Sequence, residues 1–216
     1  MRSLIKCQGF IFDVDATLVD TTTVINNIWK SWATKKNIGF ELVYPHIHGR
    51  KVNETLKAID PRYENICEET EIKIIAREQM SSARAIDGAL DFVSSIPLSK
   101  WAIATSGPRA IATTSLKASG FPAPSNMICG EDVCKGKPDP EPFTRAADLL
   151  GVSPKECVAF EDSPAGVKSA KSAGCFTIAL KTSHETDALA EADLLVDTFE
   201  NISIHKESDG FILTEI

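Results

Sequence analysis

Two aspartates, Asp13 and Asp15, stand one residue apart directly after the apolar run GFIF at residues 9–12. A lone pair of this kind is often a turn or a helix cap. At the end of a buried element, however, two carboxylates repel each other and lose hydration, so they need a cation or a proton to be stable. The position after an apolar run therefore indicates a site that binds a cation.

Further polar residues follow other apolar runs in the same way. In chain order they are Thr105 and Ser106 after KWAIA, Lys137 in GKPDPEP after NMIC, and Glu161 and Asp162 after CVAF. Several carboxylate oxygens together suit a hard divalent ion such as Mg²⁺. The backbone N–H groups of TSGPR, at the start of a helix, and the lysine charge suit a phosphate. The combination predicts phosphoryl transfer.

The elements that must position these residues alternate between strand and helix. Helices have clear boundary signals: Ser163 can cap a helix that ends at Gly174, and Asp139 with Pro140 can open one that ends at Gly151. Such alternation predicts an α/β fold, a doubly wound parallel sheet whose ligands bind beyond the carboxyl ends of the strands. The runs expected to form buried strands are 9–12, 100–104, 126–129, 157–160 and 175–180.

One segment interrupts the alternation. Residues 21–84 show helical patterns, such as WKSWATKK and ETEIKIIAREQMSSARA, and are too long for a simple crossover. We therefore expect a helical cap domain at 21–84 inserted into a catalytic core formed by 1–20 and 85–216. The C-terminal segment 202–216 is expected to form a hairpin that turns at Ser208–Asp209–Gly210.

Composition limits the possible partners and compartments. The net charge of −7 argues against a nucleic-acid or anionic-membrane surface, and no apolar run approaches the ~20 residues of a membrane span. The six cysteines form no C-x-x-C pair or zinc spacing, which favours reduced thiols. We expect a cytoplasmic protein that binds neither nucleic acid nor membrane. The oligomeric state stays open, and a monomer is compatible with the sequence.

The motifs together resemble the haloacid dehalogenase superfamily. The D-x-D-x-T, the TS pair, the lysine of GKPDPEP and the ED pair occur in the order of that superfamily. KWAIATSG, GKPDPE, FEDSPAGVKSAKSAG and the HG of HGRKV are similar to the fungal phosphatases that act on 2-deoxyglucose-6-phosphate and on glycerol phosphate. The resemblance implies a Rossmann-like core, a helical cap, and a Mg²⁺-dependent phosphatase whose partner is a small phosphorylated sugar or polyol.

The resemblance also implies a role for each motif residue. Asp13 would be the nucleophile, and Asp15 would protonate the leaving group and then activate water. The metal ligands would be Asp13, the Asp15 carbonyl and Asp162, with Glu161 farther from the ion. Phosphate would be held by Thr105, the backbone beside Ser106, and Lys137.

Two positions depart from the family pattern. Ala16 replaces the usual glycine after the second aspartate, where a methyl group could force a costly positive φ. In the cap segment HIHGRKV, Lys51 stands where the resembled phosphatases tend to have arginine. Because that segment has little apolar surface, we expect His48 and Lys51 to contact a hydroxyl-rich substrate. Two alternatives to hydrolysis remain: a sugar phosphomutase of the same superfamily and an inactive binding module, the latter supported only by Ala16.

Overall fold

The structure, a computed structural model, describes residues 4–79 and 83–216. Its centre is a parallel sheet, as the sequence predicts, and it has six strands in the order β6-β5-β2-β7-β8-β9. These strands are β2 (Gly9–Phe12), β5 (Trp101–Ala104), β6 (Met127–Ile128), β7 (Cys157–Glu161), β8 (Phe176–Leu180) and β9 (Leu194–Val196). The short edge strand β9 has no counterpart in the prediction.

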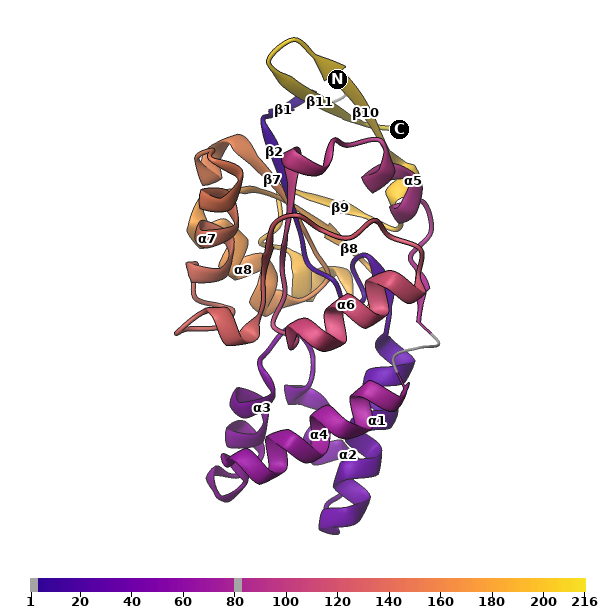
Figure 1. Ribbon diagram of the computed structural model, residues 1–216, viewed down its shortest axis with the longest axis vertical. Helices are drawn as coiled ribbons and strands as arrows, with labels where there is room; N and C mark the ends of the chain where they lie inside the picture. The colour runs from indigo at the N-terminus through magenta and orange to yellow at the C-terminus, as the bar shows by residue number, and fades with distance from the viewer. Residues whose placement is uncertain (1–3, 80–82) are drawn as a thin grey trace.

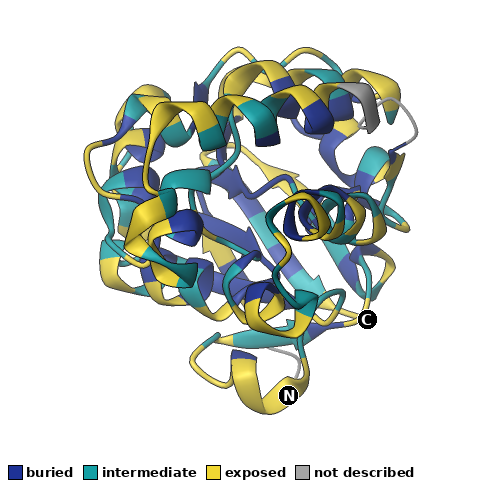
Figure 2. Cartoon of the chain, turned by 90° about the horizontal axis from the view of Figure 1, so that it is seen from below, coloured by how far each residue is buried: buried dark blue, intermediate teal, exposed yellow. Residues whose placement is uncertain are grey.

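Helices cover both faces of this sheet (Figure 1). On one face, α7 (Glu141–Leu150) and α8 (Pro164–Ala173) pack small apolar side chains against alternate residues of β2, β5 and β7. On the other, α5 (Ala89–Ser94) and α6 (Arg109–Ala118) cover an aromatic layer in which Phe12 and Phe160 stack with ring centroids 5.0 Å apart. Figure 2 shows the central strands enclosed by this packing.

The helix boundaries confirm the capping signals. The Ser163 hydroxyl accepts a hydrogen bond from the Gly166 N–H (3.1 Å), and Gly174 ends α8 at φ 99°. Helix α7 begins after Pro140 and ends at Gly151, whose φ of 69° suits a residue without a β-carbon. The loops that carry the polar residues are therefore fixed at both ends.

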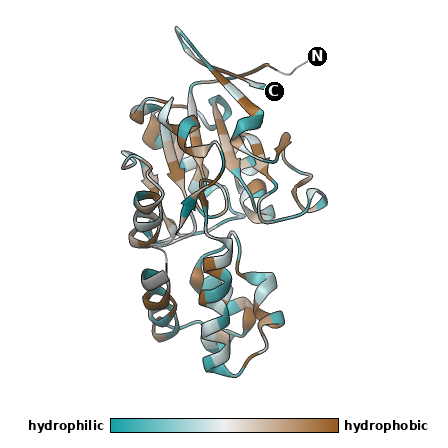
Figure 3. Cartoon of the chain, turned by 90° about the vertical axis from the view of Figure 1, so that its right-hand side faces the viewer, coloured by the Kyte–Doolittle hydropathy of each residue, from teal (hydrophilic) through white to brown (hydrophobic). Residues whose placement is uncertain are grey.

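The inserted segment forms a helical layer beside the carboxyl ends of the strands (Figures 1 and 3). It contains α1 (Thr22–Lys36), α2 (Phe40–Val43), α3 (Val52–Ile59) and α4 (Ile66–Gln79) around its own apolar cluster, which includes Trp29, Trp32 and Leu56. The chain enters and leaves it through a short antiparallel ribbon, β3 (Val19–Asp20) and β4 (Arg84–Ala85). Part of the helical prediction, residues 80–82, lies outside the described residues.

A third sheet lies at the opposite end of the core. The predicted hairpin is present as β10 (Ile202–Glu207) and β11 (Gly210–Glu215), and the N-terminal strand β1 (Leu4–Cys7) pairs with β11. Gly210 adopts a φ of 136°, and a β-carbon there would approach the Cys7 carbonyl oxygen to 2.3 Å. Within the described part of the chain, no helix is both long and apolar enough to cross a membrane.

Candidate active site

The sheet order brings the predicted residues together. Strand β2 lies between β5 and β7, so Asp13, Thr105 and Asp162, which follow these three strands, meet at one edge. Lys137 arrives from the loop after β6 and is almost completely buried. The expected convergence at the carboxyl ends is therefore present in the structure.

Lys137 is the centre of a buried charge network. Its Nζ donates to Asp13 Oδ1 at 2.5 Å and also to Glu161 Oε1. Burial opposes the lysine charge, but the Asp13 and Glu161 carboxylates outweigh it and raise the pKa of Lys137. Lys137 therefore stays cationic in a place that water does not reach.

Glu161 makes more hydrogen bonds within the fold than its position in the sequence indicates. Besides Lys137, it accepts hydrogen bonds from the N–H groups of Asp162 (3.0 Å) and Ser163 (3.2 Å). Its Oε2 also accepts from the Ser163 hydroxyl at 3.0 Å. Glu161 thus accepts from a lysine cation, two backbone N–H groups and a hydroxyl, whereas the Asp162 carboxylate accepts from two hydroxyls, which leaves Glu161 less able than Asp162 to coordinate an ion.

The acidic residues form a group that fits a divalent cation. Carboxylate oxygens of Asp13, Glu161 and Asp162, all buried, lie within 4.8 Å of one another. Burial, with Glu161 as the next cause, raises the pKa of Asp162 to about 8, and burial likewise raises the pKa of Asp13. A bound cation would offset this cost, and all-oxygen donors suit a hard ion.

Asp162 is oriented by Thr17, the threonine of D-x-D-x-T, and by Ser183, which no motif revealed. Ser183, in the loop after β8, donates a hydrogen bond to its Oδ2, and the Thr17 hydroxyl lies 3.3 Å from its Oδ1. Ser183 in turn contacts His184 Nδ1 at 2.7 Å. The sequence offered no signal for this loop, because its role depends on contacts between distant segments.

Asp15 lies on the wall of the cavity between core and cap, and burial raises its pKa. A carboxyl that tends to keep its proton is suited to act as a general acid. The next residue, Ala16, has a φ of 57°, so the predicted positive φ is present. Its N–H donates to the Val19 carbonyl (2.7 Å) and its carbonyl accepts from Thr182, and these contacts hold the strained turn in place.

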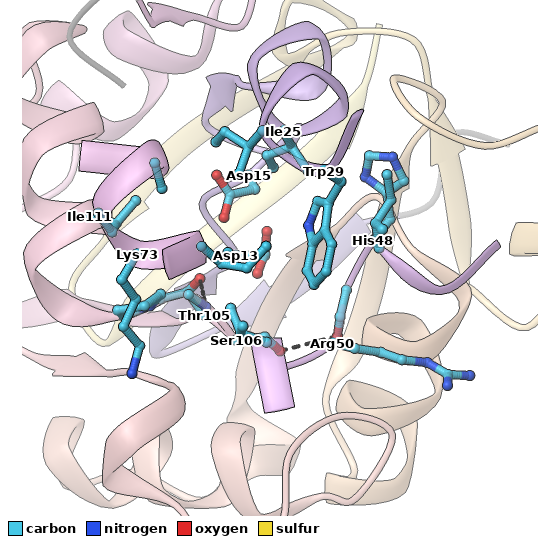
Figure 4. A pocket seen from close by; sticks show the side chains of 18 of the residues that line it. Asp13, Asp15, Ile25, Trp29, His48, Arg50, Lys73, Thr105, Ser106 and Ile111 are labelled. Atoms are coloured by element: carbon cyan, nitrogen blue, oxygen red, sulfur yellow. Dashed lines mark hydrogen bonds between the residues drawn. The ribbon is translucent and has the colours of Figure 1, made fainter. Parts of the chain in front are cut away.

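The Thr105 loop makes a hydrogen bond within itself and another to the cap. Thr105 Oγ1 accepts a hydrogen bond from the Gly107 N–H (3.0 Å), while the Ser106 hydroxyl donates to the cap carbonyl of Gly49 (3.0 Å). Figure 4 shows Thr105 and Ser106 beside Asp13. The Ser106 side chain thus joins core to cap, and only its backbone is free for the predicted phosphate contact.

Core and cap enclose a cavity of about 90 Å³ whose lining includes Asp13 and Asp15. His48 lines it, as expected, and so does Arg50. Lys51 does not: its Nζ donates to the Val133 carbonyl at 2.7 Å, away from the aspartates. This contact joins the cap to the core, and the expectation that Lys51 contacts substrate stays a prediction.

A second contact strengthens this cap attachment. Glu54, on α3, accepts hydrogen bonds from the N–H groups of Lys51 and Gly136, both at 3.3 Å. A β-carbon on Gly136 would lie 2.7 Å from the Glu54 carboxylate, so any larger residue would displace the Glu54 side chain from this contact. The cap therefore rests directly on the loop that carries Lys137.

A parallel sheet with acidic residues at its carboxyl edge and a helical cap inserted after β2 defines a class of hydrolase. The chain matches the model of the haloacid dehalogenase-like hydrolase family over residues 10–180 and belongs to that family.

The similarity to characterised phosphatases extends over nearly the whole chain. Hexitol phosphatase A of Escherichia coli is 34% identical over 97% of this chain and 100% of its own length. The 2-deoxyglucose-6-phosphate phosphatase 2 of Saccharomyces cerevisiae is 31% identical over 95% of this chain and 94% of its own. The crystal structure of a hydrolase from Pseudomonas syringae has the same fold, with a TM-score of 0.76, 24% identity and coverage of 87% and 92%.

Proposed function

We propose that this protein is a Mg²⁺-dependent phosphomonoesterase that acts on small sugar or polyol monophosphates through an aspartyl-phosphate on Asp13. The observation that carries the proposal is the buried group of Asp13, Lys137 and Asp162 beside the cavity that Asp15 lines. Such a group combines a nucleophile, a fixed positive charge and a cation site within reach of one phosphate. We place the catalytic core at 1–20 and 85–216 and the cap at 21–84.

In the first step, an Asp13 carboxylate oxygen attacks phosphorus and the bond from phosphorus to the ester oxygen breaks. Asp15 gives its proton to the departing alkoxide, so the leaving group departs as an alcohol. In the second step, Asp15 removes a proton from water, whose oxygen attacks the same phosphorus and releases phosphate from Asp13. The raised pKa of Asp15 suits the acid step, and its position on the cavity wall suits both.

The remaining core residues hold the phosphoryl group. Lys137 fixes Asp13 and offsets negative charge, while Thr105 and the backbone beside Ser106 face the same space. Asp13, the Asp15 carbonyl and Asp162 would hold Mg²⁺, with Glu161 farther out because Lys137 and backbone donors occupy its oxygens. When bound, Mg²⁺ would neutralise charge on the phosphate oxygens and orient them for attack.

Small phosphate esters agree with the size of the site and with the relatives. The cavity of about 90 Å³ is well below the roughly 300–1,000 Å³ of sites for drug-sized ligands. The relatives named above act on hexitol phosphates and 2-deoxyglucose-6-phosphate, as their names state.

All six cysteines are free thiols. A cytoplasmic location agrees with this and remains a prediction.

The inactive-module alternative has little support. Its one argument was Ala16, yet the chain accommodates Ala16 at positive φ while Asp13 and Asp15 still flank the cavity. Loss of function by that methyl group would require a displaced aspartate.

The test is phosphate release from sugar and polyol monophosphates with Mg²⁺ and with EDTA, in wild type and Asp13→Asn. We expect Mg²⁺-dependent release by the wild type and none by the variant, whose amide is a poor nucleophile. The matched control is Glu191→Gln, which also removes one acidic group. Glu191 lies in the loop before the edge strand β9, far from the site, so this variant should keep full activity. Equal release by Asp13→Asn would remove the proposed nucleophile. Isomerised sugar phosphate with little free phosphate would favour the phosphomutase alternative.

A further inference from the structure

The half of the cavity that faces the leaving group is mainly apolar, contrary to the expectation drawn from HIHGRKV. Figure 4 shows the indole of Trp29 between the catalytic aspartates and His48. Aliphatic side chains from the cap and from α6 complete this surface, which we call the apolar wall. Its members are Ile25, Ile28, Trp29, Ile47, Val52, Ile72, Ala76 and Ile111.

The central member of the apolar wall, Trp29, is held rigidly. Its ring packs edge-on against Trp32, with centroids 5.7 Å apart and an interplanar angle of 78°. Trp32 is itself fixed by a hydrogen bond from its Nε1 to Glu68 Oε2 at 2.7 Å. A fixed aromatic face that borders a cavity can pack against the C–H surface of a ligand without ordering a mobile side chain.

The polar residues on this side offer little charge inside the cavity. Burial, and then the neighbouring His184, lower the pKa of His48 to about 4, so its imidazole is neutral near pH 7. Arg50 is exposed, and Lys73 pairs with Glu69 at 3.3 Å. Figure 4 shows the charged ends of Arg50 and Lys73 directed away from the aspartates. Arg50 and Lys73 border the cavity with their stems, so an anionic group on the substrate that faces Trp29 would lie against hydrocarbon or neutral imidazole.

We propose that this site selects phosphate monoesters whose leaving group is uncharged and presents a C–H face to Trp29, and that it rejects esters bearing a second phosphate or a carboxylate. The inference rests on the proposed phosphatase function and narrows its substrate class. Burying an unpaired anion costs far more than burying a hydroxyl that meets His48. A phosphomutase must also hold a sugar bisphosphate, and the apolar wall provides no cation for the second phosphate.

The first experiment compares kcat/KM of the wild type for neutral and anionic leaving groups. The neutral substrates are 2-deoxyglucose 6-phosphate and sorbitol 6-phosphate; the anionic ones are phosphoglycolate and fructose 1,6-bisphosphate. We expect the neutral substrates to be preferred at least about a hundredfold, because an unpaired anion would be desolvated against the wall. Comparable values for the two groups would overturn the inference while leaving the phosphatase function intact. No release from any substrate would instead overturn the phosphatase function.

The second experiment changes the wall. Trp29→Gln should lower kcat/KM for the neutral sugars about 10- to 200-fold, the range for loss of one apolar contact, and Trp29→Phe should keep most of it. Acetyl phosphate, whose leaving group is too small to reach the wall, should react within about threefold of wild type in both variants. Equal losses for acetyl phosphate and sugars would mean that Trp29 supports the fold and does not read the leaving group.

A variant that adds a cation to the wall should gain activity toward anionic substrates, and such a gain cannot be mistaken for damage to the fold. Ile25 is a half-buried member of the wall at the margin of the cap's apolar cluster, so Ile25→Lys places a cation there at a smaller loss of packing than at a fully buried position. We expect the ratio of kcat/KM for phosphoglycolate to that for 2-deoxyglucose 6-phosphate to rise at least tenfold. The matched control is Leu42→Lys, on the exposed surface of the cap, which should leave the ratio unchanged. An unchanged ratio in Ile25→Lys would contradict the inference.

Discussion

Replacing Lys137 by methionine removes the cation from the buried network and keeps a side chain of similar length. The Lys137 Nζ lies over the Phe143 ring, 5.3 Å from the centroid, and methionine replaces this cation with a thioether that can still pack against an aromatic ring. Asp13 and Glu161 would lose their shared partner, and removing one member of a buried ion pair costs about 3–5 kcal/mol. For a chain of this length, 1 kcal/mol shifts Tm by roughly 2–4 °C, so we expect a fall of about 6–20 °C.

The pH dependence gives the loss a signature. Without Lys137, the already raised pKa values of Asp13 and Asp162 would rise further, so the folded state would bind more protons than the unfolded chain. Stability then falls as pH rises, and the deficit of Lys137→Met should be larger at pH 8 than at pH 5.5. Phosphate release should fall about 10²- to 10³-fold, as for loss of one group that stabilises transition-state charge.

Calorimetry in EDTA at the two pH values, with Lys135→Met as the control, measures both effects. Lys135 lies in the same loop but its side chain is 76% exposed, so its replacement should change stability by less than about 0.5 kcal/mol. An unchanged Tm in Lys137→Met, or a deficit that does not depend on pH, would refute the account of the network.

Five further substitutions test three separate parts of the site. Asp162→Ala should raise the Mg²⁺ concentration for half-maximal activity far more than Glu161→Ala does, when each variant is scaled to its own maximal activity. Equal shifts in the two Mg²⁺ titrations would mean that the ligands are misassigned. Ala16→Gly should keep kcat within about tenfold and the free energy of unfolding within about 1 kcal/mol, because glycine relieves the strain of the positive φ and this offsets the packing lost with the methyl group. Ala16→Val should lower the free energy of unfolding, measured by urea denaturation, by more than about 2 kcal/mol. The pKa of His48 is lowered to about 4 in the folded protein, so the unfolded chain takes up the proton first as pH falls. The free energy of unfolding should therefore fall between pH 6.5 and pH 4, and His48→Gln should make this fall less steep. An unchanged pH dependence of unfolding would count against a neutral buried imidazole.

The catalytic core could be predicted because its signals are local. The runs that form β2, β5 and β7 are continuous and apolar. Each run leads into polar residues, and the carboxyl ends of neighbouring parallel strands place those residues side by side. The caps of α7 and α8 likewise depend on neighbouring residues. Asp13, Asp15 and Asp162 were therefore found from order and position along the chain.

The cap side of the site could not be predicted in the same way. Whether Lys51 faces substrate or the Val133 carbonyl depends on how α3 docks on a loop 82 residues away, and no local pattern encodes that distance. Trp29 belongs to an amphipathic helix whose apolar face looks like ordinary core in the sequence. Only the docked structure shows that part of that face borders the cavity rather than the interior.

The central claim is that Asp13 becomes phosphorylated. The most direct measurement is acid quenching of the wild-type enzyme during turnover with 2-deoxyglucose 6-phosphate and Mg²⁺, followed by borohydride reduction and peptide mass spectrometry. An acyl phosphate is reduced to an alcohol, so the account predicts conversion of Asp13 to homoserine, dependent on substrate and absent in EDTA. Rapid phosphate release with unmodified Asp13, or with the modification on Asp15 or Asp162, would contradict it.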